Sequence, residues 1–224
     1  MNVDLRQPLY SCSPGNRSEG SEEMKVLRNV KLGKIAAIFN GLPDTRQHGL
    51  VYKTSFITYN FIQPNHLGIY NDINSPSEIK RQTPVSECYF IRKNDIILKR
   101  LNPDAATLVS EDAPNTTFSN NLIVIRVFKE HFPAYIACLL ENQGIARLNN
   151  NIVGAVATVK SISVQSLAAL DIPAVEYAKQ LALGRMWLLH KQRKRLLSDL
   201  MTEDQRLMAA AIKNVTAGAG EGER

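Results

Sequence analysis

The sequence predicts an α/β protein of the α+β kind: a globular domain with a twisted, mainly antiparallel sheet, followed by one long C-terminal helix that forms a coiled coil. The first observation is a series of short runs between residues 28 and 173 that are rich in Ile, Val, Tyr and Phe, the residues enriched in strands. The second is a change near residue 174, after which strong helix formers dominate and no proline occurs. The chain therefore contains two structural regimes.

Five strands and two short helices are predicted in the first regime. The strands cover residues 35–39, 50–57, 85–91, 95–101 and 122–127, with turn-forming residues between them at 40–43, 74–76 and 102–104. One helix is predicted over 133–142, where apolar residues recur at helical spacing. A second is predicted over 163–170 and is followed by Pro173. The order of these elements predicts a mixed domain built on a sheet.

Composition divides the chain into four segments. Residues 1–27 are polar and rich in turn formers, which predicts a flexible N-terminal arm. Residues 28–173 form the globular domain, and residues 174–215 form the long helix. Residues 216–224 are rich in glycine and predict a flexible tail.

The bulk composition is that of an intracellular globular protein with a basic surplus. The formal net charge is +6, which is compatible with a polyanionic partner because Lys and Arg neutralise phosphates. Cys12, Cys88 and Cys138 lie far apart, and the four histidines are scattered, so we expect reduced thiols and no metal site. No signal-peptide pattern and no apolar run of membrane-spanning length occur. We expect a cytoplasmic protein that does not bind membranes.

The long helix carries an apolar stripe with a spacing of eleven residues. Met186, Leu197 and Met208 form one row, and Leu189, Leu200 and Ala211 form another, so the stripe is nearly straight. Such a stripe requires a cover, which is either the chain's own domain or a second chain. About forty helical residues span roughly 60 Å, which exceeds a compact domain of this size, so part of the stripe should project and seek a partner. The predicted dimer or partner interface is Met186, Trp187, Leu189, Leu197, Leu200 and Met208, although Trp187 could equally pack on the domain.

Basic and amide side chains recur at the predicted turns of the domain. Arg, Asn and Gln match guanine and adenine edges, and Lys, Ser and Thr serve phosphates. The candidate DNA-binding residues are Arg46, Gln47, Lys53, Arg81, Lys99, Arg100, Asn102, Thr117 and Asn120. Solvated loops carry the same residue types, so the set as a whole supports a DNA-binding surface more strongly than any single residue does. The basic run 190–195 on the helix could follow a phosphate backbone, face an acidic partner or be a solvated face.

Known catalytic signatures are absent from the sequence. It contains no nucleophile elbow, no phosphate-binding loop and no His-Glu-x-x-His motif. Asn102-Pro103-Asp104-Ala105 lacks the second proline and the aromatic residue of an amino-methyltransferase box, so we interpret it as a turn. We expect no catalytic residues and no cofactor.

The order of four segments is similar to that of a known family. Residues 30–38 followed by Gly41-Leu42-Pro43 look like the opening of a target-recognition domain, and residues 91–98 are similar to a strand in which Asn94 replaces the usual glycine. Residues 132–140 resemble the helix that follows, and 154–173 resemble the lead into the family's long helix. The chain resembles a half-length specificity subunit of type I restriction–modification enzymes. Residues 173–180 depart from the family's usual proline-rich run, and full-length subunits carry two domains.

The resemblance implies a non-catalytic DNA-reading protein. Its target-recognition domain, residues 28–173, would lie in the major groove of double-stranded DNA. Its helix, residues 174–215, would act as a spacer in a coiled coil and dock the methyltransferase (modification) subunit and, where present, the restriction subunit. With one domain, the chain would pair with itself as a homodimer and read a two-part site.

Three other interpretations stay open at this point. The chain could be a stand-alone DNA-binding protein derived from such a subunit. It could be a protein-interaction module, which would bind its partner without the steep salt dependence of phosphate contacts. It could also be an enzyme with an unfamiliar site, in which case the purified protein would hold a metal or a cofactor.

Overall fold

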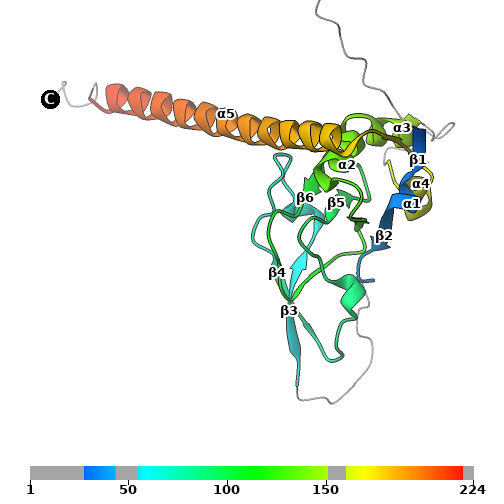
Figure 1. The fold of residues 1–224 in the computed structure, drawn as a ribbon. Helices are drawn as coiled ribbons and strands as arrows, with labels where there is room; N and C mark the ends of the chain where they lie inside the picture. The colour runs from blue at the N-terminus through cyan, green and yellow to red at the C-terminus, as the bar shows by residue number, and fades with distance from the viewer. Residues whose placement is uncertain (1–27, 44–54, 151–159, 219–224) are drawn as a thin grey trace, which may run out of the picture.

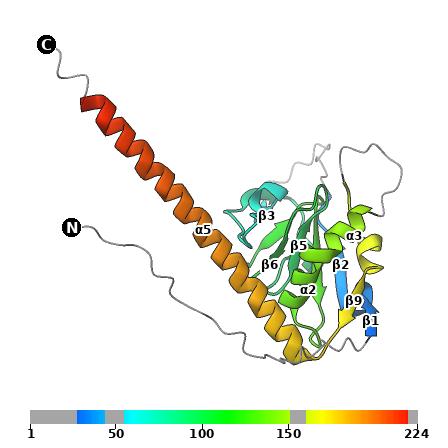
Figure 2. The ribbon, with the colours of Figure 1, turned by 90° about the horizontal axis from the view of Figure 1, so that it is seen from above.

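The computed structural model describes residues 28–43, 55–150 and 160–218. These residues form a mixed domain from which a single long helix, α5 (Tyr177–Gly218), projects far to one side (Figures 1 and 2). The two regimes predicted from the sequence are therefore present, and the α+β fold class is confirmed.

The centre of the domain is an antiparallel four-stranded sheet. Its strand order is β2 (Ala36–Asn40), β8 (Leu122–Val127), β5 (Ile96–Lys99) and β6 (Ala106–Leu108). Both faces are buried, since Ile123 and Ile125 of β8 enter one apolar cluster while Leu122 and Val124 enter another. Alternate residues of a strand point to opposite faces, so a run without polar residues forms a strand covered on both sides.

Helices cover one face of this sheet. The helix α2 (Pro133–Leu139) continues through a π-helical turn, Leu140–Gly144, into α3 (Ile145–Asn150). The start of α5 and the short helix α4 (Val164–Ala168) complete the layer (Figure 2). Ser163 caps α4 by accepting a hydrogen bond from the Ser166 amide at 3.0 Å. This layer connects the sheet to the long helix.

A small three-stranded sheet covers the other face. Its order is β4 (Ser77–Arg81), β3 (Ile57–Ile62) and β7 (Thr116–Phe118), with β7 parallel to β3. Phe118 and Ile62 are almost completely buried between the two sheets. The end of β4 and the start of β3 are paired, and they lie at the far end of the domain from α5 (Figure 1).

The two ends of the domain meet in a third, two-stranded sheet. The strand β1 (Arg28–Lys31) leads into one turn of helix, α1 (Leu32–Ile35), and pairs with β9 (Asp171–Ala174). Lys31 and Asp171 form an exposed ion pair at 2.8 Å across it. Since β9 ends at Ala174, α5 begins at Tyr177 and not at the predicted residue 174. It also continues to Gly218, three residues beyond the predicted end at 215.

The predicted strands agree with the structure only where the apolar run is long. The strand over 122–127 has the predicted bounds, and 35–39 and 95–101 contain β2 and β5 within a few residues. The strand predicted over 85–91 is wrong, because this segment forms a 3-10 turn, Glu87–Tyr89. Half-buried Phe90 instead packs on the core residue Tyr59: their ring centres lie 5.8 Å apart, and the Tyr59 hydroxyl accepts the Val85 amide at 3.2 Å. Of the strand predicted over 50–57, only the part from residue 55 is described, and β3 begins at Ile57.

Candidate nucleic-acid interface

At one edge of the central sheet, the end of β2 lies beside the end of β7 and the start of β8. The Gly41 backbone passes so close to the β7–β8 turn that a Cβ there would lie 2.1 Å from the Ser119 carbonyl oxygen. The Leu42 amide donates to the Phe118 carbonyl at 2.8 Å, and the Asn120 amide donates to the Leu42 carbonyl at 3.1 Å. Only glycine permits this approach, so the turn predicted at 40–43 is locked against the β7–β8 turn.

A groove of about 370 Å³ opens beside this junction. Its walls come from the β2 end, the β7–β8 turn and the β3–β4 pair. The described residues that line it are Leu42, Pro43, Phe61, Gln63, Pro64, Ile79, Lys80, Arg81, Ser119, Asn120 and Asn121. None of these carries a carboxylate, and the groove combines two cations with three amide side chains. This is the chemistry that reads base edges and phosphates in DNA.

The structure brings three of the predicted DNA-binding residues to this groove. Arg81 and Asn120 line it directly. The Arg100 amide donates to the carbonyl of groove residue Asn121 at 2.8 Å, so the end of β5 lies at its edge. Arg81 is the last residue of β4 and does not lie in a loop as predicted. The side-chain amides of Asn120 and Asn121 make no hydrogen bond to any described residue.

Three other predicted residues have structural roles here. Thr117 is completely buried in β7, and its hydroxyl donates to the Asn60 carbonyl at 3.4 Å, so its assignment to a DNA surface is wrong. Lys99 forms an ion pair with Asp104 at 2.9 Å. Asn102 adopts the left-handed conformation with φ 46°.

Asn102 joins the end of β5 to the segment that precedes α4. Its backbone N–H donates to the Lys160 carbonyl at 2.7 Å, and its side-chain oxygen accepts the Lys160 backbone N–H at 3.0 Å. It could offer a paired donor and acceptor to adenine only by giving up this side-chain bond. The remaining candidates, Arg46, Gln47 and Lys53, lie outside the described residues.

Sequence reasoning missed Gln63 and left Lys80 and Asn121 out of the candidate set. Lys80 and Asn121 are adjacent to Arg81 and Asn120, so the same signal covers them. Gln63 precedes the 3-10 turn Pro64–His66, and Gln before Pro is a turn signal without functional meaning. Only the fold brings Gln63 next to the β7–β8 turn.

The helix α5 divides the predicted partner residues into two groups. Met186, Leu189, Leu197, Leu200 and Met208 are exposed, with between 49% and 65% of each side chain accessible. Trp187 is 4% exposed and belongs to the main core, so its assignment to a partner interface is wrong and the alternative of packing on the domain is correct. Trp187 lies about 100° around the helix from Met186, which is enough to reverse its surroundings.

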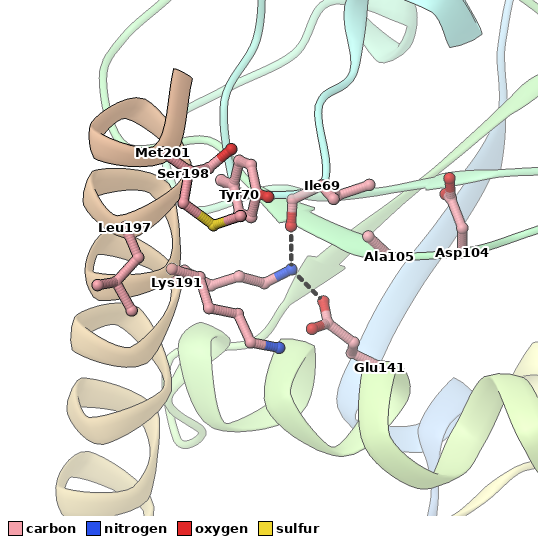
Figure 3. A pocket seen from close by; sticks show the side chains of 10 residues that line it. Ile69, Tyr70, Asp104, Ala105, Glu141, Lys191, Leu197, Ser198 and Met201 are labelled. Atoms are coloured by element: carbon pink, nitrogen blue, oxygen red, sulfur yellow. Dashed lines mark hydrogen bonds and ion pairs between the residues drawn. The ribbon is translucent and has the colours of Figure 1, made fainter. Parts of the chain in front are cut away.

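Three residues of the basic run 190–195 face acidic groups of the chain's own domain, whereas Arg193 lies beside the exposed leucines of α5. Lys191 and Lys194 line a pocket that also contains Asp104 and Glu141, and Figure 3 shows Lys191 reaching from α5 into it. Arg195 lines the neighbouring pocket with Asp72, Glu111 and Asp112. Charge is therefore segregated: the wall under α5 is acidic, whereas the lining of the far groove carries cations and amides.

Metal and membrane sites were also sought in the described part of the chain. No group of three or more His, Cys, Asp or Glu residues there is arranged to hold a metal ion. None of the described helices has the length and apolar character that a bilayer crossing requires.

Comparisons with known proteins gave structural matches only. No protein-family model and no curated protein matches the sequence. The HsdS subunit of Thermoanaerobacter tengcongensis superposes with a TM-score of 0.54 at 19% identity, over 85% of this chain and 46% of the other. A chain from a structure of complex assembly and conformational transition in a type I R-M system superposes with a TM-score of 0.63 at 14% identity, over 92% and 49%.

This chain has the fold of a type I specificity subunit. The match includes the domain and the long helix, since it covers most of the chain in both comparisons. The chain spans about half the length of the HsdS subunit and of the second structure's chain. The fold that the sequence resemblance implied is therefore confirmed.

Proposed function

We propose that this chain is a half-length, non-catalytic specificity subunit of a type I restriction–modification system. Its domain reads double-stranded DNA, and it directs a methyltransferase subunit and, where present, a restriction subunit to a two-part site. The fold likeness supports this function class. The groove lined by Lys80, Arg81, Asn120 and Asn121, in which no described residue carries a carboxylate, carries the proposal.

The groove suits DNA for two physical reasons. None of the described residues that line it belongs to α5, whereas α5 lines the pockets at Lys191 and Arg195. The lysine and arginine attract phosphate, and the amides of Asn120 and Asn121, which bond no described residue, offer the donor and acceptor that match adenine. The carboxylates under α5 already face cations, since Glu141 pairs with Lys191 and Asp104 with Lys99, whereas no described residue of the groove lining carries a carboxylate.

The exposed stripe of α5 supplies the second half of the proposal. Two copies pair through Met186, Leu189, Leu197, Leu200 and Met208, which covers apolar surface that the domain leaves open. A two-fold dimer presents two identical domains and reads an inverted repeat. The methyltransferase subunit docks on the paired helices.

The salt dependence of binding tests this proposal against a protein-interaction module. We expect affinity for mixed-sequence duplex DNA to fall by about tenfold or more between 50 and 200 mM salt, because two or more phosphate contacts each release counterions. Lys80→Ala should reduce the slope by about one unit, while Lys34→Ala, at the other end of β2, should leave it unchanged. Binding that ignores salt, or no binding to DNA at any salt, would exclude the DNA-reading function.

A further inference from the structure

The joint between α5 and the domain ends at a buried lysine. The buried residues among those described in α5 are Gln180, Gly184, Trp187 and Lys191, which recur at helical spacing, and Leu183 and Leu188 are partly buried against the same core. Lys191 is the last buried residue of the helix, and from there to residue 216 every described side chain is exposed except the half-buried Ser198. Lys191 is therefore the last buried contact of the helix with the domain, and beyond it Leu197, Ser198 and Met201 only line an open pocket beside Ile69 and Tyr70.

The ammonium of Lys191 ties the helix to separate parts of the domain. Its Nζ lies 2.6 Å from the Glu141 Oε2 and donates to the Ile69 carbonyl at 2.6 Å (Figure 3). The same Glu141 oxygen accepts the Ala106 amide of β6 at 3.1 Å. The ammonium also lies 5.5 Å from the centre of the Trp187 ring. One nitrogen thus links α5 to the 67–73 loop and, through Glu141, to the central sheet.

The first turns of α5 are fixed just as firmly. The Gln180 side chain accepts the Phe132 amide at the start of α2 at 3.1 Å and donates to the Val175 carbonyl at 2.9 Å. A Cβ at Gly184 would lie 2.6 Å from the Phe132 ring, so the two helices are in close backbone contact. With Gln180 and Gly184 at one end and Lys191 at the other, the direction of α5 relative to the domain is determined.

A buried ion pair is an expensive way to gain stability. Well-packed apolar residues of the same volume are often as stabilising as a buried pair, and the core around Trp187 could have been completed by a leucine or methionine. The ion pair fixes the direction of α5 relative to the domain, because the ammonium has to contact the Glu141 carboxylate and the Ile69 carbonyl at the same time. Glu141 itself lies in the π-helical turn between α2 and α3, a local irregularity frequent at functional positions.

The direction of α5 is amplified by its length. The helix continues from Lys191 to Gly218, which is about 40 Å at 1.5 Å per residue. A tilt of about 10° at the joint moves the far end by about 7 Å, which is the length of roughly two base pairs. In a dimer joined through α5, the tilt would change the distance between the two recognition domains by a similar amount.

We propose that Lys191 and Glu141 are positioning residues that fix the spacer length between the two half-sites of the target DNA. This inference rests on the proposed function, because it requires a DNA-reading dimer. The ion pair holds α5 at one angle to the domain, so that the two grooves meet the duplex at one separation. Each added base pair also rotates the second half-site by about 34°, so a rigid joint accepts one spacer length and a loose joint accepts several.

The test is a selection from random duplex DNA with the full chain and its genomically adjacent methyltransferase. The variants are Lys191→Met, which keeps the stem and removes the ammonium, and Glu141→Gln, which retains an acceptor for the Ala106 amide. Lys194→Met, one turn along the same pocket, is the matched control. We expect the wild type and the control to select one spacer length and to reject spacers one base pair shorter or longer by roughly tenfold or more. Both joint variants should select the same half-sites. In their selections, the shorter and longer spacers should be enriched to within about threefold of the original spacer.

A second measurement examines the joint without DNA. One spin label is attached to the native, exposed Cys88 and a second to Lys213→Cys, so that the pair reports the distance between domain and helix. The other two cysteines are removed by Cys12→Ser and Cys138→Ala. The labelled chain is diluted with unlabelled protein. We expect a narrow distance distribution with Lys191 and a broader one with Lys191→Met, in proteins with the same helical circular dichroism.

The outcomes separate the two proposals. If the wild type selects no DNA, the proposed function fails, and with it the spacer role, whatever the label distances show. If the wild type selects a split site and both joint variants keep its single spacer length, the proposed function stands and the positioning role of Lys191 and Glu141 is overturned. A loss of half-site preference together with spacer preference would likewise overturn it, because a positioning residue changes only the spacing.

Discussion

At the scale of single residues, base recognition depends on a few side chains held at strand ends. Asn120 is fixed through its backbone to Leu42, and Arg100 is fixed through its backbone to Asn121. Their side chains are left to meet a ligand, because the hydrogen bonds that hold these residues use backbone atoms. A fixed backbone with an available side chain is what direct readout of base edges requires.

Replacing these two side chains tests their role. We expect Asn120→Ala and Arg100→Ala each to reduce discrimination at one base position by about 1–3 kcal/mol, the value of a lost bidentate contact. Competition binding with single-base variants of the selected target measures this. Asn102→Ala should instead lower stability, since its side chain joins β5 to Lys160. Unchanged discrimination in the first two variants would remove the groove from the account.

A second residue-scale feature supports the sheet behind the groove. Asp95 is 1% exposed and accepts the Arg126 guanidinium at 2.8 and 2.7 Å and the Arg92 amide at 2.8 Å. The Arg126 guanidinium also donates to the Phe90 carbonyl at 3.0 Å, and its hydrogen bond to the Asp95 carboxylate raises the pKa of Arg126. The pair therefore joins β8 to the start of β5 and to the aromatic turn that precedes it.

We expect Asp95→Ala to lower the free energy of unfolding by about 3 kcal/mol, because it leaves the Arg126 guanidinium and the Arg92 amide without their acceptor. Asp171→Ala, which breaks the exposed ion pair with Lys31, should cost at most about 1 kcal/mol. Urea unfolding of both variants measures the difference. Equal costs would show that the buried pair does not support the sheet.

At the scale of elements, the sequence predicts those that carry a local signal. The strand β8 is predicted because five of its six residues are apolar and four of these follow one another, and α5 is predicted by composition over forty residues. The strands β6 and β7 have only three residues each, which is too short for a periodic pattern. Their places are set by pairing with β5 and β3, and such long-range pairing leaves no trace in a short window.

The candidate site was likewise predicted where the signal is local and missed where it depends on long-range packing. Asn94 was noted where related sequences have glycine, and its φ of 71° explains why, because Asn tolerates the left-handed region that glycine favours. Thr117 was misassigned because the polar run 115–121 looks like a solvated loop, yet its second and third residues form a buried strand. Burial depends on what packs above a segment, and for Thr117 this is the β3 strand some sixty positions earlier.

The exposed stripe of α5 gives an element-scale prediction. We expect the wild-type chain to be a dimer and Leu200→Glu to weaken self-association by about 2–5 kcal/mol, because it places a charge in the paired apolar seam. Ala209→Glu, at an exposed position, is the matched control, since it lies about 180° around the helix from Leu200. Light scattering at tens of micromolar distinguishes the states. A monomeric wild type, or equal effects of the two variants, would contradict pairing through this stripe.

At the scale of the whole molecule, the distribution of charge and the projecting helix both favour a protein that reads DNA as a pair of copies. Glu141 binds Lys191 of α5, and the helix then projects from the domain (Figure 1), while no described residue that lines the groove belongs to α5. The chain spans about half the length of the structures whose fold it shares, and the exposed stripe provides a means of joining two copies. A protein built in this way would read two separated half-sites related by two-fold symmetry.

The measurement that tests this central claim most directly is selection of duplex DNA from a random library by the full chain with its adjacent methyltransferase. The account predicts enrichment of a split inverted repeat with one spacer length, and loss of half-site preference when Asn120 and Arg100 are both changed to alanine. Recovery of DNA without sequence preference, or of a single unrepeated site unaffected by these two changes, would contradict it.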